Sequence, residues 1–131
     1  MRPTIRVVAG ALFDPQGHVL IAQRPPGTHM AGRWEFPGGK IDAGETELEA
    51  LRRELREELG VTLRDAERLL ELSHDYPERR VEISMWRVTS YSGVPRSLDG
   101  QALKWVDPRD LEREDLLEAD RPILAALVAG R

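Results

Sequence analysis

Hydrophobic and polar residues alternate along the chain with spacings that predict strands on both sides of a central helix. Apolar, β-forming residues dominate two early stretches, 5–13 and 19–22. The segment Asp14–Gly17 between them has proline at its second position, which is typical of a β-turn. We therefore expect the two stretches to pair as a hairpin. Later apolar stretches predict short strands at 34–36, 68–74, 81–90 and 103–106.

A helical spacing begins after Thr46 and ends before Gly60. Four leucines recur at steps of three or four residues, so a helix places them on one stripe: Leu48, Leu51, Leu55 and Leu59. Thr46, with Glu49 three residues later, predicts a capping box at the start of this helix. Gly60 predicts its end, because glycine readily adopts the left-handed conformation that terminates helices.

The same helix carries a second stripe that is strongly acidic. Glu54, Glu57 and Glu58 share one face, where like charges destabilise a helix by roughly 0.2–0.5 kcal/mol per pair. A hard divalent cation prefers several oxygen ligands and would offset this repulsion. The alternative interpretation is a solvated surface face, on which Arg53 pairs with Glu49 and Glu57.

Residues 121–128 predict a last helix, with Asp120 as its N-cap and Pro122 at its first position. No internal repeat, low-complexity tract or linker interrupts the pattern, so we expect a single domain over residues 1–131. Strands mixed with two main helices indicate an α+β fold in which a β-sheet lies between helices.

The composition excludes several classes of protein. Hydrophobic residues make up 40% and charged residues 32% of the 131 residues, which is typical of a folded globular domain. The apolar runs are far shorter than the roughly 18 residues of a transmembrane helix, and no convincing signal peptide is present. The absence of cysteine excludes disulfides and thiolate metal sites. We expect a cytoplasmic protein without a membrane partner, and the formal net charge of -4 argues against a nucleic-acid polymer as partner.

The acidic stripe lies within a longer pattern that resembles the Nudix box. The matching residues are Gly39, Glu45, Arg53-Glu54-Leu55, Glu57-Glu58 and Gly60-Val61. This resemblance implies the Nudix fold, an α/β/α sandwich with a mixed β-sheet between helices and a loop–helix–loop at the box. It also implies an enzyme that hydrolyses nucleoside diphosphates linked to another group, with Mg²⁺, or alternatively Mn²⁺, as its cofactor.

The resemblance also assigns roles within the box. Glu57 and Glu58 are implied as the main metal ligands, and Glu54 as a ligand or as the general base. A backbone carbonyl at Gly38 or Gly39 is implied as a further ligand.

Three other groups of residues are interpreted with less direct support from the box. Arg53 is implied as part of the catalytic set, with Glu54 and Glu57, and it is expected to pair with Glu45 across the box. Asp99 stands where related proteins have glutamate and is implied as another metal ligand. The histidines have no metal-type spacing and are assigned no chemistry: His18, His29 and His74.

The match extends beyond the box and resembles the MutT branch, the bacterial 8-oxo-dGTP diphosphatases. The matching parts are residues 22–24, 29–41, 76–79, 99–101, Trp105 and 119–124. In that branch the residues at five of these positions surround the base: Arg24, Phe36, Glu78, Arg79 and Asp120. The implied reaction converts an oxidised nucleoside triphosphate to a monophosphate and pyrophosphate, as in sanitation of the nucleotide pool. Plain alternatives are a core role for Phe36 and surface roles for the two arginines.

The base preference stays open because related bacterial MutT has asparagine where this chain has Asp120. An amide donates and accepts, whereas an ionised carboxylate only accepts and favours the amino group of cytosine. CTP and modified pyrimidine nucleoside triphosphates are therefore alternative substrates, unless Asp120 is protonated. A non-catalytic nucleotide sensor of the same fold is another alternative, which the intact acidic stripe disfavours. The expected partner is a small nucleotide, bound by a monomer or a homodimer.

Overall fold

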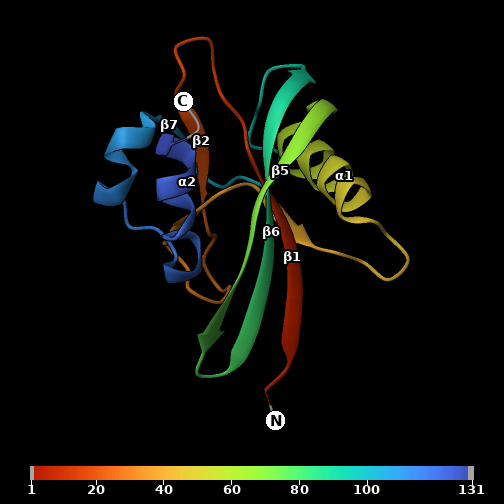
Figure 1. Cartoon of the computed structure of the whole chain (residues 1–131), viewed down its shortest axis with the longest axis vertical. Helices are drawn as coiled ribbons and strands as arrows, with labels where there is room; N and C mark the ends of the chain where they lie inside the picture. The colour runs from red at the N-terminus through yellow and green to blue at the C-terminus, as the bar shows by residue number, and fades with distance from the viewer. Residues whose placement is uncertain (1, 130–131) are drawn as a thin grey trace.

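The structure, a computed structural model, describes residues 2–129 (Figure 1). Its strands are β1 (Thr4–Ala11), β2 (Val19–Gln23), β3 (Trp34–Glu35), β4 (Gly38–Lys40), β5 (Thr62–Tyr76), β6 (Arg79–Ser92) and β7 (Leu103–Val106). Its helices are α1 (Glu47–Leu59) and α2 (Ile123–Ala129), with the 3-10 helices η1 (Pro108–Arg113) and η2 (Glu118–Asp120).

A mixed sheet with the strand order β4-β1-β6-β5 forms the middle of the molecule. β1 runs parallel to β6, with Val7 opposite Ile83, whereas β4 and β5 are antiparallel to their neighbours. Figure 1 shows α1 on one side of this sheet and α2 on the other. The predicted architecture, a mixed sheet between helices, is therefore confirmed.

Each face of the mixed sheet has its own hydrophobic core. On the α1 side, Val8 packs with Leu51 and Leu55, all fully buried. On the other side, Met85 packs towards Leu127 of α2 and towards a second, antiparallel sheet with the order β3-β2-β7. The molecule is therefore layered, and the leucine stripe of the central helix faces a core as predicted.

The predicted hairpin between residues 5–13 and 19–22 is present only next to its turn, where the N–H of Leu20 donates to the carbonyl of Leu12 at 3.0 Å, and it does not extend along the two strands. β1 and β2 meet at an isolated bridge between Phe13 and Val19 and then enter different sheets. The second half of β1 and nearly all of β2 are buried, so both faces of each strand must pack against other parts of the protein. A layered sandwich provides this packing when the two strands belong to separate sheets.

The central helix follows its predicted caps. The side chain of Thr46 accepts a hydrogen bond from the backbone of Glu49 at 3.1 Å, and the carboxylate of Glu49 accepts one from Thr46 at 2.8 Å. Gly60 has a φ of 70°, in the left-handed region, and ends the helix. The capping box therefore sets where the acidic stripe begins, and local sequence determines this element.

The strands predicted at 68–74 and 81–90 are the central parts of a much longer hairpin. β5 has 15 residues and β6 has 14, and Pro77 and Glu78 form the turn between them. β5 lies at the edge of the sheet and exposes many charged side chains, so its apolar pattern is shorter than its hydrogen-bonded length.

Asp120 does not cap the last helix, which corrects the prediction. α2 begins at Ile123, directly after Pro122, and Asp120 is the last residue of η2. Its Oδ2 instead accepts a hydrogen bond from the backbone N–H of Phe36 at 3.1 Å. A buried N–H needs an acceptor, and here the acceptor comes from a distant part of the chain.

We expect Gly38→Ala to destabilise the fold by at least about 3 kcal/mol, because overpacking against backbone cannot be relieved cheaply. A Cβ atom at this residue would lie 2.0 Å from the carbonyl oxygen of Val8 and 2.7 Å from the Cα of Ala9. Gly44→Ala is the matched control, because Gly44 has a φ of +85° and open space around it. Its cost should be about 1 kcal/mol. Urea denaturation measures both, and equal losses would contradict the prediction.

Candidate active site

Two carboxylates of α1 lie directly against the glycines of β4. The backbone N–H of Gly38 donates to Oε2 of Glu58 at 3.1 Å. A Cβ atom at Gly39 would lie 2.5 Å from the carboxyl carbon of Glu54. Only glycine at residue 39 therefore lets Glu54 come this close to β4. The predicted acidic stripe is folded against the edge strand of the mixed sheet.

Arg53 links these acids to the loop that precedes α1. Its Nε and Nη2 donate to the two carboxylate oxygens of Glu45 at 2.7 and 2.9 Å, so the expected pair is present. Its Nη1 donates to Glu54 at 2.7 Å, and its Nη2 also donates to the carbonyl of Lys40 at 3.0 Å. The hydrogen bonds from Arg53 lower the pKa of Glu45 to about 2. Arg53 thus holds the Glu54 carboxylate in one orientation.

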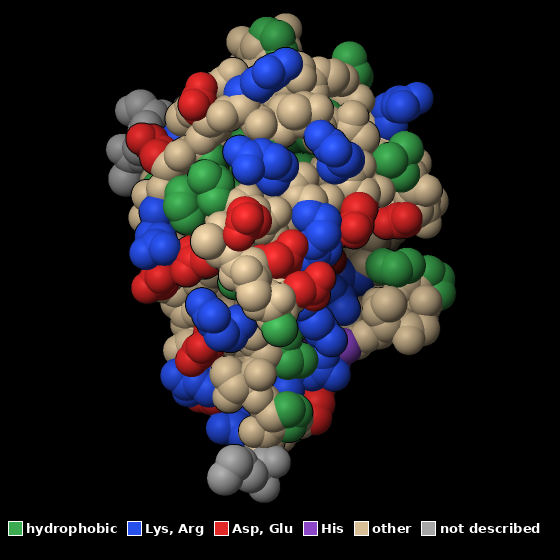
Figure 2. Space-filling view, turned by 90° about the vertical axis from the view of Figure 1, so that its right-hand side faces the viewer, with side chains coloured by type: hydrophobic (Ala, Val, Ile, Leu, Met, Phe, Trp, Pro, Cys, Tyr) green, Lys and Arg blue, Asp and Glu red, His purple; other side chains and the backbone are tan. Residues whose placement is uncertain are grey.

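Glu57 lies apart from the other two acids of the stripe. Its side chain is 60% exposed, and its distance to Nη1 of Arg53 is 3.4 Å. Figure 2, which views the α1 side, shows acidic side chains in a band across the middle of this face, with Lys and Arg side chains among them. The structure therefore divides the predicted stripe into two acids at the sheet and one towards solvent.

Negative charge is crowded around Glu58. Burial raises its pKa to about 8, and the nearby carboxylates of Glu54, Glu35 and Asp99 act in the same direction. Burial also raises the pKa of Glu54. A bound cation would relieve this crowding, because it favours the ionised form of each carboxylate.

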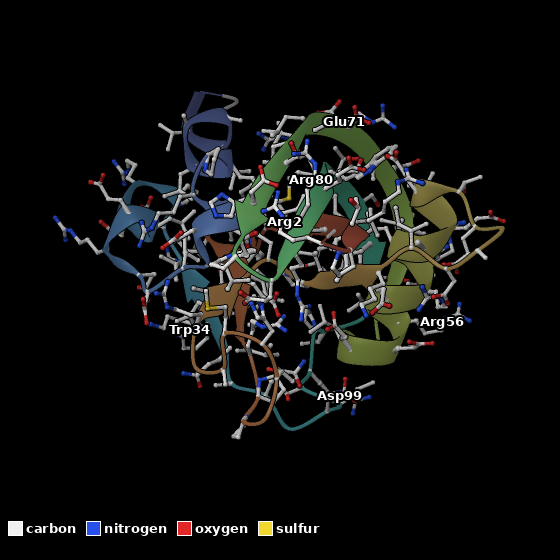
Figure 3. All side chains as sticks on the ribbon, turned by 90° about the horizontal axis from the view of Figure 1, so that it is seen from below. Arg2, Trp34, Arg56, Glu71, Arg80 and Asp99 are labelled. Carbon is white, nitrogen blue, oxygen red and sulfur yellow. The ribbon has the colours of Figure 1, made fainter. Side chains whose placement is uncertain are left out.

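The donors at this end of the site fit a hard divalent cation. Glu54 and Glu58 offer carboxylate oxygens beside the backbone of Gly38 and Gly39. Among residues 2–129, no three His, Cys, Asp or Glu side chains converge as a ready metal cluster. Asp99 is exposed on the loop between β6 and β7, as Figure 3 shows. This sparse set fits a divalent cation that is also held by substrate phosphates.

A cavity of about 260 Å³ begins beside these glycines and is lined by residues of β1, β6 and η2. Four of the five residues predicted to surround a base line it: Arg24, Phe36, Arg79 and Asp120. Gly38, Gly39 and Glu58 line the same cavity. The structure therefore brings four of the five predicted base-binding residues and part of the predicted metal-binding set into one space, although they lie far apart in sequence.

Glu78, the fifth of these residues, does not line the cavity. It lies in the turn between β5 and β6, is 50% exposed, and pairs with Nε2 of His29. The hydrogen bond from His29 lowers the pKa of Glu78. His29 lines the cavity and makes an edge-on contact with Tyr76, their ring centroids 5.2 Å apart. Nothing in the spacing of the sequence indicates this pair, because only the fold brings the two loops together.

Asp120 is buried, with 5% of its surface exposed. Burial, and then the charge of Glu35, raise its pKa to about 7. Glu35 also lines the cavity, and the sequence prediction missed it. The available signal is an acid between two aromatic residues, Trp34 and Phe36, in a short apolar strand, because an acid buried in such a strand requires a partner.

This layered fold, with an acidic helix packed against a Gly-Gly strand beside one cavity, is that of a known family. The NUDIX domain family matches residues 8–126, and the chain belongs to this family. The family resemblance predicted from the box is confirmed, and Nudix hydrolases generally use a divalent metal ion.

Several relatives match nearly the whole chain. A CTP pyrophosphohydrolase of Escherichia coli (strain K12) is 38% identical over 127 residues, which are 97% of this chain and 93% of that protein. An 8-oxo-dGTP diphosphatase of the same organism is 32% identical over 123 residues, which are 94% of this chain and 95% of that protein. A solved structure from a study of MutT of Aliivibrio salmonicida and Vibrio cholerae matches with a TM-score of 0.84 and 32% identity, covering 98% of this chain and 99% of that one.

Within residues 2–129, no helix is both long and apolar enough to span a lipid bilayer.

In the absence of divalent cations we expect Glu58→Gln to melt at a higher temperature than the wild type at about pH 8.5. The carboxyl ionises near 4.5 when unfolded and near 8 when folded, so its ionisation penalty grows between these values and is fully present above pH 8. Glutamine keeps the shape and can still accept from Gly38. Each kcal/mol of ionisation penalty that the substitution removes should raise the melting temperature by roughly 4 °C.

Thermal unfolding followed by circular dichroism, in EDTA and then in Mg²⁺, tests this expectation. Mg²⁺ should stabilise the wild type more than Glu58→Gln, because a ligand stabilises only the form that binds it. Glu57→Gln is the matched control, and its melting temperature in EDTA should stay close to that of the wild type, since Glu57 is mainly exposed. If the wild type melts at a higher temperature than Glu58→Gln in EDTA, the claim that ionised Glu58 destabilises the folded protein is contradicted.

Proposed function

We propose that this protein is a metal-dependent hydrolase of nucleoside triphosphates, with 8-oxo-dGTP as its favoured substrate. The observation that carries the proposal is one cavity lined by Gly38, Gly39 and Glu58 and also by Arg24 and Asp120. A base can meet the hydrogen-bonding side chains while its phosphates reach the oxygen donors beside β4. The similarity to an 8-oxo-dGTP diphosphatase over 94% of the chain supports this substrate.

Mg²⁺ is the proposed cofactor, with Mn²⁺ as an alternative. The proposed ligands are the carboxylates of Glu54, Glu57, Glu58 and Asp99, with a backbone carbonyl of Gly38 or Gly39. When bound, the ion would supply positive charge for the phosphates and make a bound water more acidic. Such charge is required because the protein has a formal net charge of -4 and by itself repels a triphosphate.

Glu54 is our candidate for the general base, or else a ligand. It lies against Gly39, and Arg53 donates to it at 2.7 Å, which fixes its orientation. Burial raises its pKa, which favours its ability to take a proton from water near neutral pH. Arg53 acts on this step through Glu54, as a positioning residue.

The proposed reaction gives a nucleoside monophosphate and pyrophosphate. Water attacks the β-phosphorus and gives its proton to the general base, for which Glu54 is the candidate. The bond from the β-phosphorus to the oxygen that bridges it to the α-phosphorus breaks. The bridging oxygen stays with the monophosphate. Arg24, Phe36, Arg79 and Asp120 are proposed to hold the base, and Glu78 to act at the cavity rim through His29.

CTP or a modified pyrimidine nucleotide is the second candidate substrate. The 38% identity to a CTP pyrophosphohydrolase favours it. An ionised Asp120 would also favour it, because a carboxylate can accept from the amino group of cytosine but cannot donate.

We expect Glu57→Gln to lower kcat by about 100-fold or more in Mg²⁺ while the fold is retained, because the change removes a proposed ligand charge but keeps the shape. Steady-state kinetics and circular dichroism measure the two effects. Glu71→Gln removes an exposed carboxylate of β5 that pairs with Arg68 outside the cavity, and it should leave kcat near the wild-type value. Near-normal turnover by folded Glu57→Gln would refute the role of Glu57.

The proposed substrate is tested by comparing kcat/KM for 8-oxo-dGTP, dGTP and CTP in the wild type and in Asp120→Asn. If protonated Asp120 reads the oxidised guanine, Asp120→Asn should keep or improve the preference for 8-oxo-dGTP, since an amide also donates and accepts. A wrong base leaves a polar group unpaired at about 1–3 kcal/mol, or roughly 5- to 150-fold in this ratio.

The same reactions run in ¹⁸O-labelled water identify the phosphorus that is attacked. We expect the label in pyrophosphate, and label in the monophosphate would refute attack at the β-phosphorus. A wild type that hydrolyses CTP far better than 8-oxo-dGTP would transfer the proposal to the pyrimidine nucleotides.

A further inference from the structure

Arg24 and Glu35 form a fixed ion pair inside the cavity. Nη1 of Arg24 lies 3.1 Å from each carboxylate oxygen of Glu35, and its Nε donates to the backbone carbonyl of His29. Both side chains are largely buried, with 24% and 27% of their surfaces exposed. Arg24 is therefore held from two sides, and the Glu35 carboxylate cannot turn away from the cavity without losing its cation.

Asp120 is held next to this pair by the backbone that follows β3. Its Oδ2 accepts from the N–H of Phe36, the residue that follows Glu35. Its Oδ1 makes no hydrogen bond within the part of the chain that the structure describes. The other charged or titratable groups around the shared cavity come from every element that packs there: Arg24, His29, Glu35, Lys40, Glu58, Tyr76 and Arg79.

We propose that Glu35 is a specificity-determining positioning residue. Arg24 fixes its carboxylate in place and opposes the effect of burial on it, so that Glu35 carries the negative charge and Asp120 keeps a proton. Asp120 then presents both a donor and an acceptor to the base, as an asparagine would. This inference rests on the proposed function, because it needs a base in the cavity.

The electrostatics agree with this division of charge. Burial raises the pKa of Glu35 and of Asp120. The charge of Glu35 raises the pKa of Asp120 further, whereas Arg24 acts in the opposite direction on both acids. Arg24 contacts both oxygens of Glu35 and none of Asp120, so the negative charge belongs on Glu35.

A purely structural ion pair is the competing explanation. Burial of Glu35 outweighs the effect of Arg24 on its pKa, so stabilisation of the fold is a poor reason for this pair.

The first test measures the titration of Asp120 in the free protein by ¹³C NMR, with Asp120→Asn identifying its carboxyl signal. In Glu35→Gln, Asp120 should titrate at least about one pH unit lower, a tenfold change in its proton affinity, because a negative neighbour has been removed. Glutamine keeps the shape and can accept from Arg24. Glu118→Gln is the matched control: Glu118 is two residues from Asp120 but 58% exposed, so Asp120 should titrate as in the wild type. An unchanged titration in Glu35→Gln overturns the inference.

The second test follows the ratio of kcat/KM for 8-oxo-dGTP to that for CTP against pH. The wild-type ratio should fall as pH rises through about 7, and in Glu35→Gln the fall should come about one pH unit lower. In an Asp120→Asn background, Glu35→Gln should leave the ratio unchanged. A fall at the same pH in both proteins overturns the role in specificity. If the NMR change occurs but neither nucleotide is hydrolysed, the electrostatic inference is supported and the proposed function has failed.

Discussion

The close approach of α1 to β4 is the constraint on which the rest of the site depends. Gly38 and Gly39 leave no Cβ between the helix and the strand, so Glu54 and Glu58 reach the backbone of β4. A larger residue at either position would push the acids away from the cavity or break the pairing of β4 with β1. The loop–helix–loop therefore depends on tight packing of α1 against β4. The position of the acidic side chains at the cavity follows from this short distance between helix and strand.

This packing concentrates negative charge that the protein only partly neutralises. Arg53 offsets Glu45 and Glu54 at one end of the site, and Arg24 offsets Glu35 at the other. Glu58 and Asp120 have no basic partner within hydrogen-bonding distance among residues 2–129, and burial raises the pKa of both. The charges of the two acids would therefore be neutralised in different ways. A bound cation would neutralise Glu58, where phosphates would lie, and a retained proton would neutralise Asp120, where a base would lie.

The cavity unites these two ends because it lies where the layers of the molecule meet. The end proposed for the phosphates comes from α1 and β4, and the end proposed for the base comes from β3, η2 and the loop after β2. At the rim, the turn between β5 and β6 reaches the loop after β2 through Glu78 and His29. Contacts between distant segments thus shape the end proposed for the base, whereas the end proposed for the phosphates depends on one helix and one short strand.

The sequence by itself determined the central helix, its caps, its two stripes and the family, because these depend on spacing within about a dozen residues. It also indicated seven of the residues that line the cavity, through resemblance over most of the chain. The tertiary structure decided what short-range spacing does not encode. It places β1 and β2 in different sheets, and it lets Asp120 accept a hydrogen bond from the backbone of Phe36. It also leaves Glu57 exposed, although Glu54 and Glu58 of the same acidic stripe pack against β4. The position of Glu35 at the cavity was likewise decided by the tertiary structure, since the burial and charge around an acid depend on residues far away in sequence.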